Sequence, residues 1–176
     1  MIKRDASERL VQLWREFPVV LVSGARQVGK TTLVELLAKR LKIAQQLSLD
    51  QSGSRERISE GPELFVESLR LPAFLDEAQK SPVLFEAIKQ LVDRNHKSGR
   101  FILSGSANFL LLKRVSESLA GRCARLFLRG FSLRERMKRT GKTPHLEACL
   151  RVYSARDLLT CCHDTHREVC LTSQGF

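Results

Sequence analysis

The sequence lacks any long hydrophobic run. Although 43% of its 176 residues are hydrophobic, no stretch approaches the about 20 consecutive apolar residues that a helix needs to cross a bilayer. Residues 1–9 alternate charged with small and polar side chains, whereas a signal peptide needs a continuous apolar segment. We therefore expect a cytoplasmic location and no membrane partner.

A dense basic block is also missing. The formal net charge is +11, and a cluster of Lys and Arg would favour a nucleic-acid partner by releasing counterions from phosphate. The basic residues are scattered, however: residues 1–130 hold 22 basic and 14 acidic side chains, and the remaining 46 residues hold 8 and 5. A nucleic-acid or other anionic partner therefore stays open beside the simpler interpretation, a solvated surface.

Cysteines paired at metal-binding spacing are absent as well. Four of the five cysteines and three of the four histidines follow residue 144. His163 and His166 have the spacing of zinc ligands, but Cys161 and Cys162 are adjacent instead of two residues apart. Two such histidines would share a helix face with or without a metal, so zinc is the weaker interpretation. Nothing marks the chain as secreted, and disulfides are not expected.

The sequence does contain a regular alternation of apolar strands with amphipathic helices. Five apolar segments predict strands, and apolar residues at three- and four-residue spacing predict helices between them. The predicted strands are residues 19–22, 46–49, 73–75, 101–103 and 124–128; the predicted helices are residues 5–17, 32–41, 63–71, 82–92, 107–120 and 133–139. This order predicts an α/β fold with a five-stranded, mainly parallel sheet between helices. A polar stretch with Gly53, Ser54 and Arg57 follows the second predicted strand. Residues 1–135 are predicted as one core, and residues 136–176 as an irregular tail.

A glycine-rich motif follows the first predicted strand. Residues 24–31 (GARQVGKT) match G-x-x-x-x-G-K-[ST] at every specified position. The glycines allow backbone N–H groups to converge on phosphate oxygens at the positive end of a helix dipole. Lys30 would reach the β and γ phosphates, and the Thr31 hydroxyl would hold Mg²⁺. The predicted ATP-binding residues are Gly24, Ala25, Arg26, Gln27, Val28, Gly29, Lys30, Thr31 and Thr32.

The third predicted strand runs into two carboxylates, Asp76 and Glu77. Asp76 would give the second contact to magnesium, and Glu77 would orient or deprotonate the attacking water. A helix cap is the alternative, but the complete phosphate loop upstream favours the catalytic interpretation. The Asp-Glu pair favours hydrolysis over phosphoryl transfer to a small molecule. The chain has no [NT]-K-x-D guanine signature, which argues against a GTPase.

These motifs occur in the order found in a known family. The strings VSGARQVGKTTL (22–33), FLDEAQKSP (74–82), FILSGSANFLL (101–111) and SESLAGR (116–122) resemble the prokaryotic AAA+-type P-loop ATPases. Within that class the chain resembles the group that carries a C-terminal domain of unknown function. The resemblance covers about residues 1–135. It implies an AAA+-like core that binds ATP and Mg²⁺, ATP hydrolysis coupled to an unknown partner, and a homo-oligomer.

The resemblance also implies roles for two polar positions. A strand with a polar sensor, assigned to residues 101–106, would lie between the loop strand and the Asp-Glu strand. Ser104 or Ser106 would then contact the γ-phosphate or the water, with an ordinary strand-end cap as the alternative. Arg122 would be a charge-neutralising arginine, supplied to a neighbouring subunit; the alternative is an arginine that interacts with a helix dipole. The role of Arg26 is left open.

The end of the chain departs from the family. Members continue for about as many residues again, whereas here a Cys-, His- and Arg-rich segment follows the last family-like residues. We expect a truncated or frameshifted tail that is poorly packed past about residue 140. In that case a nucleotide-binding remnant without turnover, or an interaction module, is the alternative to an active ATPase.

Overall fold

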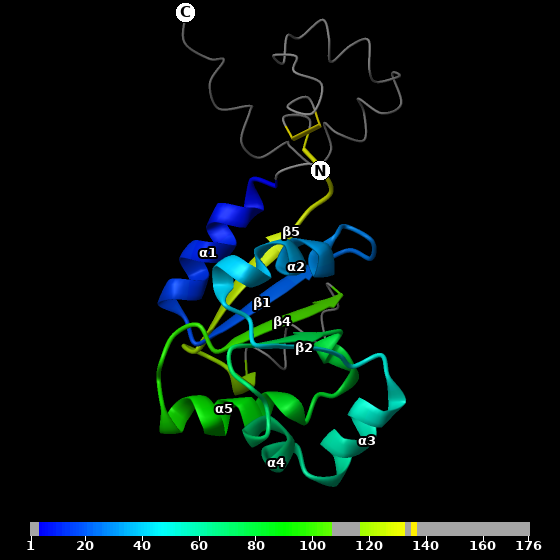
Figure 1. Ribbon diagram of the computed structural model, residues 1–176, viewed down its shortest axis with the longest axis vertical. Coiled ribbons are helices and arrows are strands. Elements are labelled where there is room, and N and C mark those ends of the chain that lie inside the picture. Colours follow the sequence, from blue (N-terminus) through cyan, green and yellow to red (C-terminus); the bar gives the residue numbers. More distant parts are fainter. Residues whose placement is uncertain (1–3, 107–116, 133–134, 137–176) are drawn as a thin grey trace, which may run out of the picture. The chain divides into compact units, whose positions relative to one another are not determined.

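The computed structural model describes residues 4–106, 117–132 and 135–136. The chain divides into two compact units after Phe131, and the first holds the helices and strands of Figure 1, most of which are labelled there. In chain order they are α1 (Ala6–Glu16), β1 (Val19–Gly24), α2 (Lys30–Leu41), β2 (Gln45–Ser48), α3 (Ser52–Glu60), α4 (Pro62–Glu67), β3 (Ala73–Asp76), the 3₁₀ turn η1 (Ala78–Lys80), α5 (Leu84–Arg94), β4 (Phe101–Ser106) and β5 (Cys123–Leu128).

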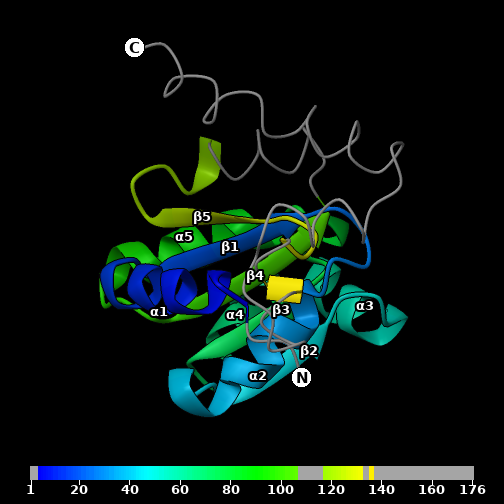
Figure 2. The ribbon, with the colours of Figure 1, turned by 90° about the horizontal axis from the view of Figure 1, so that it is seen from above.

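The five strands form one parallel sheet in the order β2-β3-β4-β1-β5 (Figures 1 and 2). This confirms the predicted α/β class. Strand β4 lies between the loop strand β1 and the strand β3 that ends in Asp76, as the resemblance implied. Because all strands run the same way, the ends of β1, β3 and β4 meet at one edge of the sheet.

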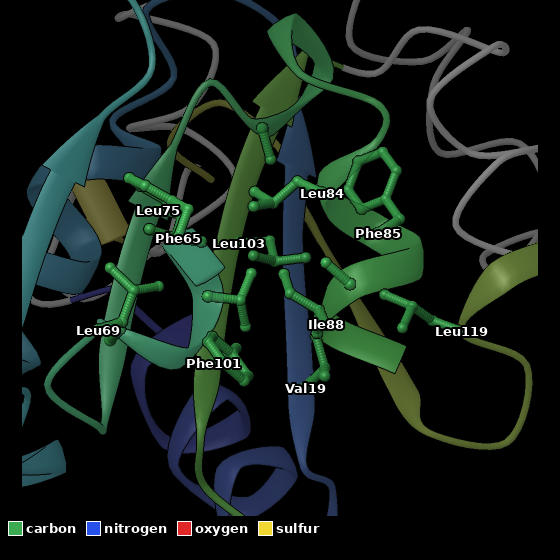
Figure 3. Close-up of a cluster of buried hydrophobic side chains, with 14 of the residues drawn as sticks. Val19, Phe65, Leu69, Leu75, Leu84, Phe85, Ile88, Phe101, Leu103 and Leu119 are labelled. Carbon is green, nitrogen blue, oxygen red and sulfur yellow. The ribbon is translucent and has the colours of Figure 1, made fainter. Parts of the chain in front are cut away.

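The sheet is buried on both faces because β1 alternates its side chains between two apolar clusters. Val19 and Leu21 pack with α4 and α5, in the cluster drawn in Figure 3. Val20 and Val22 pack with α1 and α2 on the opposite face, and Figure 2 shows α1 and α5 on opposite sides of the sheet. A strand covered on both faces must be apolar throughout, which accounts for the run VVLV in β1.

The largest departure from the predicted elements is α3, which occupies the polar stretch after the second predicted strand. Ile58 is its only buried residue, so the helix has no apolar stripe that a sequence pattern could reveal. The turn η1 was also not predicted. The other predicted elements that fall within the described residues are present with ends shifted by a few residues, and β1 continues to Gly24 because its pairing with β4 and β5 continues.

The second unit is described only at Ser132, Glu135 and Arg136. The N–H of Ser132 donates to Glu135 Oε2 at 2.8 Å, and the N–H of Glu135 donates to Ser132 Oγ at 3.2 Å. This reciprocal pair is a capping box, and residues 135 and 136 are helical, in agreement with the predicted helix 133–139. The expected tail, its Cys and His residues, and most of the predicted helix 107–120 lie outside the described residues. In the part of the chain that is described, no helix has the length and apolar character to span a bilayer.

Candidate functional site

Strand β1 brings the glycine-rich loop to the edge of the sheet. Gly24 is its last residue and pairs with Leu128 on β5. A Cβ atom on Gly24 would lie 2.3 Å from the carbonyl oxygen of Leu128, so any larger residue would displace backbone. The close approach of two neighbouring strands therefore requires the first glycine of the motif.

After Gly24 the loop turns sharply into α2. Gln27 and Gly29 have positive φ angles of 63° and 88°, in the left-handed region that glycine adopts without steric cost. Gly29 caps α2, and its carbonyl accepts the N–H of Leu33 at 2.9 Å. The first N–H groups of a helix have no partner within it and lie at the positive end of its dipole. This junction has the geometry of an anion site.

Lys30 turns its side chain into the loop. Only 6% of the residue is exposed, and its Nζ donates to the carbonyl oxygens of Ala25 at 2.8 Å and Gly24 at 3.3 Å. Such partners are needed because an unpaired ammonium group is costly away from water. The loop therefore holds a positive charge beside the first turn of α2.

Thr31 and Asp76 come from different elements and meet below the loop. The Thr31 hydroxyl donates to Asp76 Oδ2 at 2.8 Å, which places a hydroxyl and a carboxylate oxygen side by side. Both are hard oxygen ligands of the kind that Mg²⁺ prefers. Among the described residues no group of three or more His, Cys, Asp and Glu side chains could form a metal site by itself. A hydroxyl and a carboxylate oxygen fit a Mg²⁺ ion that takes its other ligands from water and phosphate.

Glu77 has an unusual backbone conformation, with φ 57° and ψ 41°. Its N–H donates to Asp76 Oδ1 at 3.1 Å, and its carboxylate accepts a hydrogen bond from Gln79 Nε2. The partner Gln79 was missed in the sequence, where the only signal is its position two residues after Glu77, within η1. The left-handed turn thus fixes the backbone of Glu77, and Gln79 fixes its carboxylate.

Ser104 is fully buried and contacts Asp76. Leu75 on β3 pairs with Leu103 on β4, so the next residue of each strand, Asp76 and Ser104, are neighbours. The Ser104 hydroxyl donates to Asp76 Oδ1 and accepts the Glu77 N–H at 3.4 Å. The structure thus brings Ser104 into contact with Asp76 and Glu77, and its predicted contact with the γ-phosphate or the water stays a prediction.

A cavity of about 660 Å³ lies against the loop, a size typical of sites for small molecules and cofactors. Its lining residues are Arg26, Gln27, Gly29, Lys30, Thr31, Thr32 and Glu77. Asp76 and Ser104 do not line it, and Asp76 is next to it through its hydrogen bond with Thr31. The cavity therefore gathers most of the predicted nucleotide-binding residues and Glu77. Gly24, Ala25 and Val28 do not line it, and they shape the loop through their backbone.

Comparison with known families decides the relationship. Residues 16–137, more than half of the chain, match the AAA domain family. The chain belongs to this family. It therefore contains an AAA domain, which is a P-loop ATPase-like domain of the nucleotide-binding class. The narrower predictions, membership of the group with a C-terminal domain of unknown function and a truncated tail, stay predictions.

Two mycobacterial proteins are similar to this chain over most of its length. An uncharacterized protein of Mycobacterium bovis and an uncharacterized protein of Mycobacterium tuberculosis are each 38% identical over 135 residues, which cover 76% of this chain. The matched segment covers 30% of each relative. The chain thus spans less than a third of the length of these relatives.

Basic side chains lie near Asp50, which follows β2 in the AAA domain. The Lys80 ammonium group donates to Asp50 and holds the pKa of that carboxyl below its usual value. Arg26, which lines the cavity, and Arg55 lower the same pKa further by their charge. Three cations therefore lie near this one carboxylate.

Arg122 lies at the opposite end of the AAA domain's sheet. Its carbonyl accepts the N–H of Val19, the first residue of β1, at 3.2 Å, whereas Gly24 ends that strand about 17 Å away at the usual rise of a strand. The Arg122 guanidinium pairs with Asp93 and donates to the Ala120 carbonyl at 2.9 Å. The structure thus does not bring Arg122 to the cavity of its own chain. The predicted role toward a neighbouring subunit stays a prediction.

Proposed function

We propose that the chain binds ATP with Mg²⁺ and hydrolyses it to ADP and phosphate. The observation that carries this proposal is the hydrogen bond between Thr31 and Asp76 at the base of the glycine-rich loop. It joins the loop that suits phosphate to the carboxylate that suits magnesium, in a chain of the AAA domain family.

The loop and α2 account for triphosphate binding in this proposal. The backbone N–H groups at the start of α2 and the Lys30 ammonium group would meet the phosphate oxygens. Lys30 would exchange its hydrogen bonds to the carbonyls of Ala25 and Gly24 for bonds to phosphate. Thr31 and Asp76 would hold Mg²⁺, which when bound neutralises charge on the phosphate oxygens.

Glu77 carries the chemical step. Its carboxylate would accept a proton from a water molecule, whose oxygen attacks the γ-phosphorus while the bond to the β–γ bridging oxygen breaks. Gln79 supports this role by holding one carboxylate oxygen. Ser104 supports it less directly, because its hydroxyl fixes Asp76 and contacts the Glu77 N–H.

The experiment that tests hydrolysis is phosphate release by the wild-type chain and by Glu77→Gln. Removal of a general base costs about a hundredfold or more, so Glu77→Gln should bind ATP and release almost no phosphate. Glu63→Gln, at an exposed glutamate in the first turn of α4, is the matched control and should keep the wild-type rate. Equal background rates in all three proteins would instead support the alternative function, a nucleotide-binding remnant or interaction module.

A second experiment tests Arg122 as a residue supplied to a neighbouring copy of the chain. Arg122→Ala keeps an intact cavity, and Lys30→Met keeps an intact arginine. If the arginine acts between subunits of a homo-oligomer, each variant alone should be inactive and their mixture should recover part of the activity. An active Arg122→Ala protein would remove this part of the proposal, and so would an inactive mixture that forms hetero-oligomers. Coupling of hydrolysis to a protein or nucleic-acid partner is the remaining part of the proposed function.

A further inference from the structure

Arg4 is a buried arginine that contacts the glycine-rich loop from outside the cavity. It is only 7% exposed, and its Nη1 donates to the carbonyl oxygen of Val28 at 3.1 Å. Its Nη2 donates to the carbonyl oxygen of Arg129, and the guanidinium carbon lies 4.3 Å from the centre of the Phe131 ring. One side chain therefore joins the N-terminal segment, the loop and the segment that follows β5.

The contact with Val28 matters because that carbonyl belongs to the peptide unit that Gly29 completes. A peptide unit is planar and trans, so its C=O and N–H groups point in opposite directions. Holding the Val28 carbonyl on the outer side thus directs the Gly29 N–H toward the inner side of the loop. Gly29 lines the cavity and has a φ of 88°, and glycine is the residue whose backbone is least restricted to one conformation.

The other two contacts of Arg4 are with residues that leave the sheet. Strand β5 ends at Leu128, and residues 129–131 lead on to the remainder of the chain. Phe131 is 48% exposed, so the segment is not buried in the core. A shift of this segment would move the acceptor and the ring that hold the guanidinium group in place.

We infer that Arg4 is a positioning residue that couples the segment 129–131 to the phosphate-binding conformation of the loop. This inference rests on the proposed function, because it describes how nucleotide affinity at that site is set. It assigns a regulatory input to the site: whatever moves residues 129–131 changes the affinity for ATP. Lysine would replace the fork of donors by a single ammonium group and could not keep all three contacts.

The test is a double-mutant cycle read as ATP affinity in the presence of Mg²⁺, measured by calorimetry on the full chain. Arg4→Met should weaken binding about tenfold, the factor expected for loss of a charge-assisted hydrogen bond. Phe131→Ala should weaken ATP binding about threefold when Arg4 is present, as expected for the loss of one cation–π contact. In the Arg4→Met background Phe131→Ala should have no further effect, because coupled residues are not additive.

The matched control is Arg9→Met. Arg9 lies on α1, is exposed, and donates to Gln12 Oε1 at 3.3 Å, so its removal should leave ATP affinity unchanged. Thermal unfolding without nucleotide is measured for every variant, since a merely structural role would lower the midpoint and leave the affinity of the folded protein intact. If Arg4→Met does not fold, the same double-mutant cycle is measured with Arg4→Lys and Phe131→Leu, and non-additive losses of ATP affinity are again expected.

The outcomes separate this inference from the proposed function. A wild-type chain that fails to bind ATP would remove the proposed function and the inference with it. Wild-type binding with equal affinity in Arg4→Met, or additive effects of the two substitutions, would overturn the inference alone. Non-additive losses with an unchanged Arg9→Met control would support it.

Discussion

The hydroxyl of Thr31 and the carboxylate of Asp76 are joined by a 2.8 Å hydrogen bond although they lie 45 residues apart in the sequence. Thr31 belongs to the first turn of α2, and Asp76 ends β3, which is separated from β1 by β4. The parallel order of the strands brings both to the same edge of the sheet. A contact of this kind places two magnesium-type oxygen ligands beside a loop that suits phosphate.

The chemistry of that pair gives a first prediction. Thr31→Ser keeps the hydroxyl and should keep Mg²⁺-dependent ATP binding close to that of the wild type. Thr31→Val has nearly the same shape without the oxygen, and should lose at least about tenfold in Mg²⁺ affinity. Titrating Mg²⁺ at fixed ATP measures the difference. Equal Mg²⁺ dependence in the two variants would exclude Thr31 as a ligand.

Ser104 gives a second prediction, because its hydroxyl donates a hydrogen bond to Asp76 Oδ1. Ser104→Ala removes the hydrogen bond to the carboxylate and should weaken Mg²⁺ affinity about 10–100-fold, as loss of an outer partner of a metal ligand usually does. Ser106→Ala tests the other candidate serine of strand β4; unchanged Mg²⁺ affinity in Ser104→Ala would contradict this role of Ser104. If phosphate or water is contacted directly by Ser106, Ser106→Ala will lower the hydrolysis rate more than Ser104→Ala does.

The sequence predicted the parts of this site that depend on local spacing. The loop, Lys30 and Thr31 lie in one continuous motif, and Asp76 was predicted because it ends an apolar strand that follows a complete phosphate loop. The contact of Ser104 with Asp76 depends on the register between β3 and β4, which spacing does not fix. The contacts of Arg4 could not be predicted from the sequence either, because its hydrogen-bond partners lie 24 and 125 residues away.

Gly24 gives a third prediction, on stability. Gly24→Ala would place a methyl group against the Leu128 carbonyl oxygen, at 2.3 Å from it, and should destabilise the fold by about 1–3 kcal/mol. Gly53→Ala is the control, because a Cβ there meets nothing within 4 Å and the residue lies in α3. It should be neutral or stabilising by about 0.5 kcal/mol. Chemical denaturation compares the two, and equal stability would refute the steric account.

The ion pair between Arg122 and Asp93 gives a fourth prediction, on pH. The Arg122 guanidinium group donates to Asp93 and holds the pKa of this carboxyl below its usual value. The pair should therefore stabilise the folded chain above the unfolded-state pKa of aspartate, about 3.9, and lose this contribution as the pH falls through the lower folded pKa. Asp93→Asn should have a lower thermal midpoint than the wild type at neutral pH, and the gap should close in acid. A gap that does not change with pH would contradict the ion-pair explanation.

The most direct test of the central claim is calorimetric titration of ATP into the wild type, Lys30→Met and Lys39→Met, each with Mg²⁺. Lys30 points into the loop, whereas Lys39 lies in the last turn of the same helix. The account predicts saturable binding to the wild type and to Lys39→Met, and none to a Lys30→Met protein that remains folded. A wild type without binding heat, or a Lys30→Met protein that binds ATP as tightly as the wild type, would contradict it.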